Sequence, residues 1–336
     1  MQRKNLTEVR EFVFLGFSRF CDYQITLFVV FLVLYTLTLA GNAIIVTIIC
    51  IDRHLHTPMY FFLSILASSD TAYTLVTIPR MLSALLAQNQ PISIAGGSAQ
   101  MMFFVALAIN NCFLLTAMGY DCYVAICNPL RYTVLMSKRA CVQLLCGTSG
   151  IGLVMAVVQV TSIFTLPFCH RVVGHFFCDI LPVLKLSCID TTINEIINFV
   201  VSSCVILVPV ALVFISYGRK KAFATCASHL TVVIVHYGCA SIAYLKPKSE
   251  DSAEQDVLLS VTYTIITPLL NPVVYSLRNK EVKDALRRAK IRQNLPSQVR
   301  TLNNEIISEP LGKVRCALKV RNLEDTGLVL GSLASI

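Results

Sequence analysis

The amino-acid sequence predicts an all-α membrane protein, a bundle of seven helices that cross the bilayer. Of its 336 residues, 55% are hydrophobic and only 14% are charged, whereas about a quarter of a soluble domain is charged. Apolar runs of about 20 residues, the length needed to cross a bilayer, recur along the chain. Within lipid the backbone must satisfy its own hydrogen bonds, so each run is expected to form a helix.

Each expected span is bounded by charged residues, proline or glycine. The spans cover residues 25–51, 59–78, 99–119, 141–163, 196–217, 222–245 and 257–277. The third and the sixth are less uniformly apolar, because they contain Asn110, Asn111, His229 and His236. Polar groups at bilayer depth are costly in contact with lipid, so we expect these four side chains to face the bundle interior.

Basic residues predict the orientation of the spans. If the N-terminus lies outside the cell, the cytoplasmic loops and tail contain more Lys and Arg residues than the outer segments do. The positive-inside rule therefore favours this orientation. The expected organisation is an extracellular tail (1–24), a seven-helix domain (25–277), an amphipathic helix on the inner membrane surface (278–292) and a disordered cytoplasmic tail (293–336). The sequon at Asn5 is a glycosylation candidate consistent with an outer tail.

Composition also weighs against other classes. The net charge of +9 is explained by basic loops that meet membrane lipid. Nucleic-acid binding is not indicated, because the sequence has no basic face with exposed aromatic residues. The chain has 14 cysteines, but it contains no pair of CxxC motifs of the kind that would predict a metal site. Cys169, Cys178 and Cys188 share a more polar segment and are disulfide candidates, with the pairing left open.

Four longer motifs carry a resemblance. They are HTPMYFFLS at residues 56–64, MGYDCYVAICNPLRY at 118–132, KAFATCASHL at 221–230 and PLLNPVVYSLRN at 268–279. Together and in this order they resemble the olfactory (odorant) receptors, a branch of the rhodopsin-like, class A G-protein-coupled receptors. The resemblance implies a receptor in the plasma membrane that binds a small volatile molecule and activates a stimulatory G protein, raising cyclic AMP in the sense of smell.

The resemblance assigns roles to two groups of residues. Asn42, Asp70 and Asn271 would form a polar core that can hold sodium. The alternative for Asp70 is a protonated carboxyl in a purely structural hydrogen-bond network. Pro272 breaks a backbone hydrogen bond and can kink its helix, which would let Tyr275 move on activation.

The expected ligand cavity lies between the third, fifth and sixth spans, where small-molecule sites combine apolar walls with a few polar groups. Ordinary helix packing is the competing explanation for each candidate taken singly. The candidates are Phe104, Val105, Ala108, Val201, Val205, Ser241 and Tyr244.

Three departures from the family pattern qualify the expected signalling. The Asp-Arg-Tyr motif is Asp121-Cys122-Tyr123 here, so Asp121 is expected to lack its basic partner and the G-protein contact its cation. Gly97 stands where the family has a cysteine bonded to the second outer loop, which would leave Cys178 unpaired. Only residues 218–220 separate the fifth span from KAFATCASHL, so the third inner loop is short.

Two families of alternatives therefore stay open. Within the receptor class, the chain is either a signalling odorant receptor or a non-signalling relic retained in the endoplasmic reticulum. Outside it, a transporter or channel is disfavoured because the chain shows no repeated half and no pair of broken helices. No catalytic motif accompanies the histidines, so an enzyme is not expected, and no cofactor is implied beyond a sodium ion near Asp70.

Overall fold

The computed structural model describes residues 9–15, 23–87, 91–217, 227–245 and 260–294. The chain divides into two units, Met1–Lys283 and Asp284–Ile336. The first unit holds the long helices and every candidate site, and the second contains most of the last helix. The expected spans at 222–245 and 257–277 and the short loop at 218–220 therefore lie partly or wholly outside the described residues.

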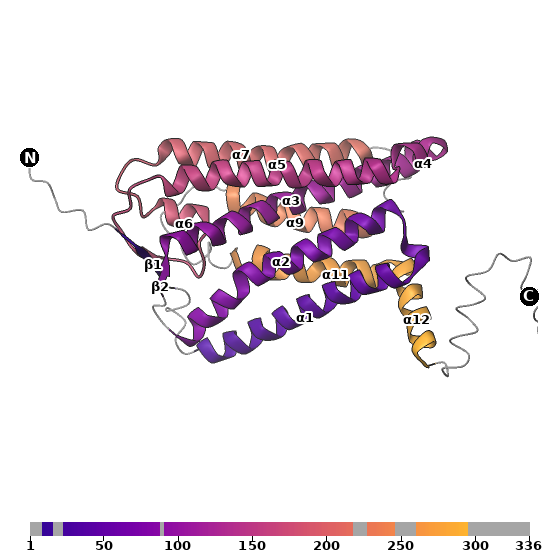
Figure 1. The fold of residues 1–336 in the computed structure, drawn as a ribbon, viewed down its shortest axis with the longest axis horizontal. Helices are drawn as coiled ribbons and strands as arrows, with labels where there is room; N and C mark the ends of the chain where they lie inside the picture. The colour runs from indigo at the N-terminus through magenta and orange to yellow at the C-terminus, as the bar shows by residue number, and fades with distance from the viewer. Residues whose placement is uncertain (1–8, 16–22, 88–90, 218–226, 246–259, 295–336) are drawn as a thin grey trace, which may run out of the picture. The chain divides into compact units, whose positions relative to one another are not determined.

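The described chain is mainly helical (Figure 1). Four of its helices are long and apolar enough to cross a membrane: α1 (Gln24–Ile51), α2 (Pro58–Leu86), α3 (Ile94–Cys127) and α5 (Lys138–Phe164). Helices α7 (Thr192–Tyr217) and α9 (Ala227–Leu245) contain shorter apolar stretches. A π-helical turn, η4 (Thr262–Ile266), leads into α11 (Thr267–Arg278).

Short elements connect these helices. They are η2 (Arg53–Leu55), η3 (Pro129–Arg131), α4 (Tyr132–Leu135) and α6 (Ile180–Leu184). Local sequence explains several helix starts, because serine side chains accept hydrogen bonds from the first backbone N–H groups. The Ser93 hydroxyl accepts from Gly96 N at the start of α3, and Ser137 accepts from Ala140 N at the start of α5.

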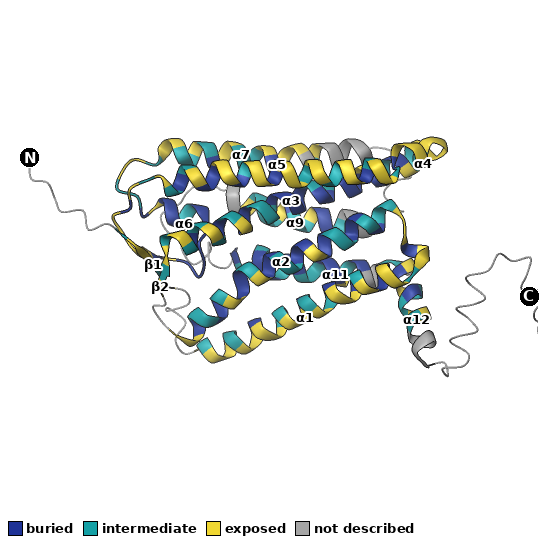
Figure 2. Ribbon diagram, viewed as in Figure 1, coloured by how far each residue is buried: buried dark blue, intermediate teal, exposed yellow. Residues whose placement is uncertain are grey.

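Helix α3 forms the centre of the first unit. It packs against α2, α5, α7 and α9, and its Met101, Leu114 and Leu115 side chains are fully buried. Helices α1, α5 and α7 expose many residues instead, as their yellow faces show in Figure 2, and several of these residues are apolar. Val29 on α1 and Val154 on α5 are examples.

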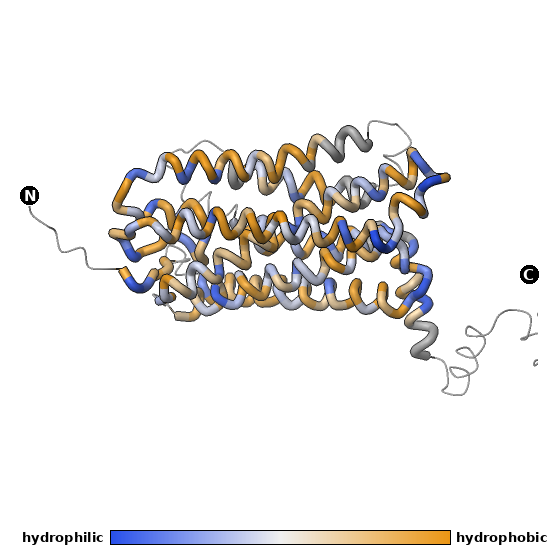
Figure 3. Tube along the Cα trace, turned by 45° about the horizontal axis from the view of Figure 1, so that its top comes forward, coloured by the Kyte–Doolittle hydropathy of each residue, from blue (hydrophilic) through white to orange (hydrophobic). Residues whose placement is uncertain are grey.

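These exposed faces are hydrophobic along much of their length (Figure 3). An apolar surface of this extent on several helices is incompatible with water but matches lipid. The combination of an apolar outside and polar groups on the inside is the arrangement expected of a multi-pass membrane protein.

A small sheet, which the sequence did not lead us to expect, lies at one end of the helices (Figure 1). Strand β1 (Glu11–Phe14) pairs antiparallel with β2 (Pro91–Ser93) and parallel with β3 (Val172–Val173), giving the order β2-β1-β3. Phe12 of β1 is fully buried. Strands this short depend on tertiary packing, which explains why local sequence patterns did not reveal them.

At the other end, Tyr60 at the start of α2 joins the beginning of α12 (Lys280–Asn294). Its hydroxyl lies 2.7 Å from Glu281 Oε2 and 3.2 Å from Asn279 Oδ1. Because one hydroxyl proton serves two acceptors, the contact holds the chain after α11 close to α2 without fixing a single bond. In the second unit, Arg287 pairs with Asp284 along α12 at 3.5 Å.

Helices α3 and α5 approach each other closely at Gly152, and this contact supports a prediction. A Cβ added there would lie 3.1 Å from the Ala106 carbonyl oxygen and 3.3 Å from Asn110 N, whereas one added at Gly150 would meet nothing within 4 Å. Gly152→Ala should lower the free energy of unfolding by about 1–3 kcal/mol through overpacking. Gly150→Ala should raise it by about 0.5–1 kcal/mol because alanine favours the helix. Thermal unfolding of both purified variants tests this, and equal shifts of one sign would contradict the contact.

Candidate functional site

A cavity of about 100 Å³ opens among α3, α7, α9 and the η4–α11 region. It is of the same order as the roughly 150 Å³ cavity that holds benzene in an engineered protein. Its lining residues are Asp70, Tyr73, Phe104, Val105, Ala108, Ile109, Asn111, Cys112, Gln159, Ile180, Val201, Ser202, Val205, Ile206, His236, Ala240, Tyr263, Thr267 and Pro268. Most of these side chains are apolar, as small-molecule sites require.

The structure brings five of the seven sequence candidates together in this lining. They are Phe104, Val105 and Ala108 on α3, with Val201 and Val205 on α7. Ser241 is not among the lining residues, because its hydroxyl turns back to donate to the Tyr237 carbonyl one turn earlier on α9 (2.7 Å). The side chain of Tyr244 lies outside the described residues.

One end of the cavity is covered by what we term the cap segment, residues 166–188. Ile180 lines the cavity from this segment, and the Phe177 ring packs on Phe104 with centroids 4.8 Å apart. Tyr263, another lining residue, donates a 2.7 Å hydrogen bond to Asp179. Apolar packing and this polar contact therefore attach the cap segment to both α3 and η4.

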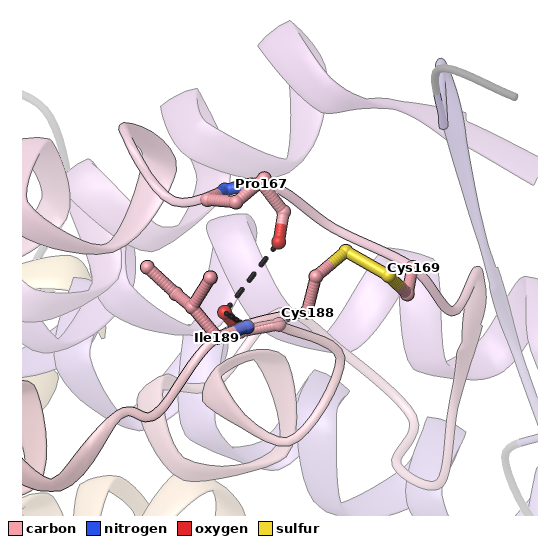
Figure 4. Close-up of a disulfide and its surroundings, with 5 residues drawn as sticks. Pro167, Cys169, Cys188 and Ile189 are labelled. Carbon is pink, nitrogen blue, oxygen red and sulfur yellow. Dashed lines mark hydrogen bonds between the residues drawn. A yellow bond between two sulfur atoms is a disulfide. The ribbon is translucent and has the colours of Figure 1, made fainter. Parts of the chain in front are cut away.

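The cap segment is closed by a disulfide between Cys169 and Cys188 (Figure 4). Cys188 N also donates to the Pro167 carbonyl at 2.9 Å, so the two strands of the loop are joined by a covalent and a backbone link. This bridge resolves the pairing that the sequence left open. Cys178 stays a thiol, fully buried.

Gly97 faces that thiol directly. A Cβ added at Gly97 would lie 2.9 Å from Cys178 Sγ, which is too close for unbonded atoms but suits the Cβ–S–S link of a disulfide with its S–S bond of about 2.05 Å. Gly97 and Cys178 are therefore placed as a disulfide would require, and the side chain on one side is missing.

A buried polar cluster lies below the cavity. Asn111 Nδ2 donates to Asp70 Oδ1 at 2.8 Å, and Asn271 Nδ2 donates to Oδ2 at 2.7 Å. The cluster thus joins α2, α3 and α11. Asn42 is buried on α1, but neither of its amide atoms has a hydrogen-bond partner within the described chain. Asp70 thus forms the hydrogen bond of the expected polar core with Asn271, and Asn111 adds a further amide to it.

The end of α3 carries the altered motif. Asp121 and Cys122 are buried, at 3% and 5% exposure, and Tyr123 is half-buried. Asp121 has a neutral hydrogen-bond partner, because the Tyr132 hydroxyl of α4 donates to its Oδ1 at 2.9 Å. Burial and the Asp121 charge raise the pKa of Tyr132, so this hydroxyl keeps its proton at neutral pH.

Other predicted positions have definite places. Pro272 lies inside α11, where an added Cβ at Gly41 of α1 would come within 3.0 Å of it. Tyr275 is fully buried one turn later. Asn5 lies outside the described residues.

Sequence reasoning missed Cys112, Tyr132 and Tyr263. Cys112 continues the helical face of Val105 and Ala108, being seven and four residues further along, so extending that periodicity would have found it. Tyr132 and Tyr263 have no such signal. Their partners, Asp121 and Asp179, are brought to them by a loop and by tertiary packing.

An apolar bundle with an internal cavity, a buried carboxylate–amide cluster and a disulfide-closed cap segment defines a multi-pass membrane protein. Comparison with known proteins identifies its class. A family model described as "Olfactory receptor" matches residues 31–293. The chain is 73% identical over 303 residues to Olfactory receptor 10J5 of Mus musculus, covering 86% of this chain and 98% of that protein.

Human relatives agree. Olfactory receptor 10J5 of Homo sapiens is 73% identical over 300 residues, covering 85% of this chain and 97% of that protein, and Olfactory receptor 10J1 is 67% identical over 303 residues, covering 86% and 95%. The chain belongs to the olfactory receptor family of G-protein-coupled receptors.

The position of Gly97 leads to a second prediction. Gly97→Cys should form a disulfide with Cys178, removing one alkylatable thiol and raising the free energy of unfolding by about 2–4 kcal/mol. Alkylation with mass spectrometry and thermal unfolding measure the two effects. The same substitution combined with Cys178→Ser provides the control, and a thiol count in Gly97→Cys that is one higher than in the unmodified chain would contradict the geometry.

His175 of the cap segment leads to a third. Its Nε2 lies 2.8 Å from Ser260 Oγ, its ring stacks on Phe176, and burial lowers its pKa to about 3. The unfolded chain binds that proton near pH 6.5, so the stability that neutral His175 provides is present above pH 6.5 and is lost as the pH falls toward 3. Between pH 7 and pH 5 the loss should reach about 2 kcal/mol.

The control for His175 is a residue that cannot titrate there. His175→Gln should show a smaller decrease in stability over the same pH interval, measured by thermal unfolding in detergent. Parallel pH profiles for the two proteins would show that His175 is not the titrating group.

Proposed function

We propose that the chain is an odorant receptor whose cavity beside α3, α7 and α9 binds a small volatile molecule. The observation that carries this proposal is the mainly apolar cavity inside the helix bundle of a chain of this family. Phe104, Val105 and Ala108 supply one wall, with Val201 and Val205 facing them, so an uncharged ligand gains hydrophobic burial of about 25 cal/mol per Å².

The cavity also offers a route from ligand to switch. Asp70 and Asn111 line it, and Thr267 and Pro268 bring it to within one turn of Asn271 and Pro272 on α11. A ligand that repositions these walls changes the carboxylate–amide cluster, which joins three helices. Pro272 leaves its helix short of one backbone hydrogen bond, and rearrangement there with Tyr275 would carry the change onward.

Sodium binding near Asp70 is part of the same proposal. Hard cations prefer carboxylate and amide oxygens, and the cluster contains the Asp70 carboxylate and the buried Asn111 Oδ1, which has no partner among the described residues. These residues fit a monovalent cation. Asp70 and Asn111 would supply the ligands and Asn271 would orient the carboxylate.

Coupling to a stimulatory G protein and cyclic AMP is the expected output, with the N-terminus outside the cell and the protein in the plasma membrane. Because Cys122 stands at this position, we expect the coupling to the G protein to be weak. A buried thiol cannot supply the bidentate cation that arginine offers, and Tyr132 now holds Asp121. A non-signalling relic, retained in the endoplasmic reticulum, is therefore the second candidate.

Cys122→Arg separates the two candidates. The double variant, Cys122→Arg combined with Gly97→Cys, is compared with the unmodified chain in cells that carry a cyclic AMP reporter. It should respond to an odorant mixture at least about tenfold more strongly, the difference that 1.4 kcal/mol makes to an equilibrium. Gly97→Cys alone is the matched control, because it restores the bridge without the cation. Labelling of an N-terminal epitope on intact cells measures how much protein reaches the surface.

A strong odorant response from the unmodified chain would refute impaired coupling. If the receptor is at the plasma membrane but its N-terminal epitope is labelled only after the cells are permeabilised, the proposed orientation is refuted. Silence of every variant at normal surface levels would favour the relic.

A further inference from the structure

The cavity contains a nucleophile beside a base. Cys112 Sγ on α3 lies 3.4 Å from His236 Nε2 on α9, and both residues line the cavity. Of the cysteines in the described part of the chain, Cys112 alone belongs to that lining. A thiol within hydrogen-bond reach of an imidazole is the pairing that activates cysteine for nucleophilic attack.

Neighbouring contacts hold the pair in register. The Tyr237 hydroxyl donates to the Cys112 carbonyl at 2.6 Å and lies 3.2 Å from Thr116 Oγ1. Because Tyr237 directly follows His236, this contact fixes α9 against α3 at the level of the thiol. His236 Nδ1 is buried without a hydrogen-bond partner in the described chain, so its ring is positioned by Cys112 and by packing.

We propose that Cys112 captures a small electrophilic odorant covalently, with His236 as its general base. The chemical class is a short α,β-unsaturated aldehyde or ketone. The inference rests on the proposed function, since it assigns a ligand class to the same cavity. A neutral molecule of this kind suits the apolar walls, and both oxygens of Asp70, the lining's acidic group, already accept amide hydrogen bonds.

The reaction needs no other reagent. The thiol proton passes from Sγ to His236 Nε2, and a sulfur electron pair forms a C–S bond to the β-carbon of the enal. The π electrons of the C=C bond move to give an enolate, and Nε2 returns the proton to the α-carbon. The product is the sum of thiol and enal, with a saturated C–C bond and an intact carbonyl group.

Covalent capture is tested on the purified full chain in detergent. The protein is incubated with trans-2-hexenal, the carbonyl is reduced with borohydride to fix the adduct, and peptide mass spectrometry locates it. We expect one enal added at Cys112, with the other cysteines modified much more slowly. An excess of hexanal, which lacks the C=C bond, should slow the labelling by occupying the cavity.

Variants assign the two roles. Cys112→Ser should abolish the adduct, and Cys112→Ala also removes the thiol if serine disturbs folding. His236→Gln should slow addition at Cys112 by at least about tenfold, because general bases contribute about 10²–10⁴-fold to a rate. Cys239→Ser, on the same helix as His236 but outside the lining, is the matched control and should label like the unmodified chain. Thermal unfolding confirms that each variant is folded.

Two results would overturn the proposal: labelling of Cys112 at the same rate in His236→Gln, or labelling no faster in the folded than in the denatured chain. If no adduct forms but hexanal still raises the thermal unfolding temperature, covalent capture is rejected while odorant binding stays in place. Absence of both the adduct and this stabilisation would count against the cavity as an odorant site altogether.

Discussion

The carboxylate of Asp70 is the constraint on which the interior depends. An ionised carboxylate at bilayer depth costs about 2.5–3.5 kcal/mol on insertion scales, and a buried polar group without partners adds about 1–3 kcal/mol. Two amide side chains meet this demand, Asn111 from α3 and Asn271 from α11. Helices α2, α3 and α11 must therefore keep one register, and the floor of the cavity is set by that register.

The opposite end of the cavity is organised differently. There the Cys169–Cys188 bridge, the ring contacts of Phe177 and the Asp179–Tyr263 hydrogen bond hold the cap segment in place. Each is individually modest, but together they attach the same loop to α3 and η4, and its strand β3 pairs with β1. Gly97 supplies no side chain here, and Cys178 is nevertheless fully buried opposite it.

The sequence predicted what hydrophobic periodicity and motif spacing can determine. Apolar runs placed α1, α2, α3 and α5 within a few residues at most starts, although α2 and α3 continue beyond the expected ends. Five cavity residues could be chosen because one helical face repeats every three or four positions.

What sequence could not provide was which polar groups meet. Asn111 donates to Asp70, and Tyr132 reaches Asp121 from a separate short helix. Both contacts depend on helix rotation and loop path, which a single sequence does not encode locally. The β1 strand escaped notice for the same reason, since its partners are about 80 and 160 residues away along the chain.

The contact between Tyr132 and Asp121 ties the end of α3 to the short helix that follows it. Tyr132 engages only Oδ1 of the carboxylate, so the second oxygen is not committed to that hydroxyl. The acid is buried and oriented without help from a basic neighbour at position 122. An arginine introduced at that position would therefore meet a carboxylate whose place is already fixed, and the end of α3 would not have to be rebuilt to receive it.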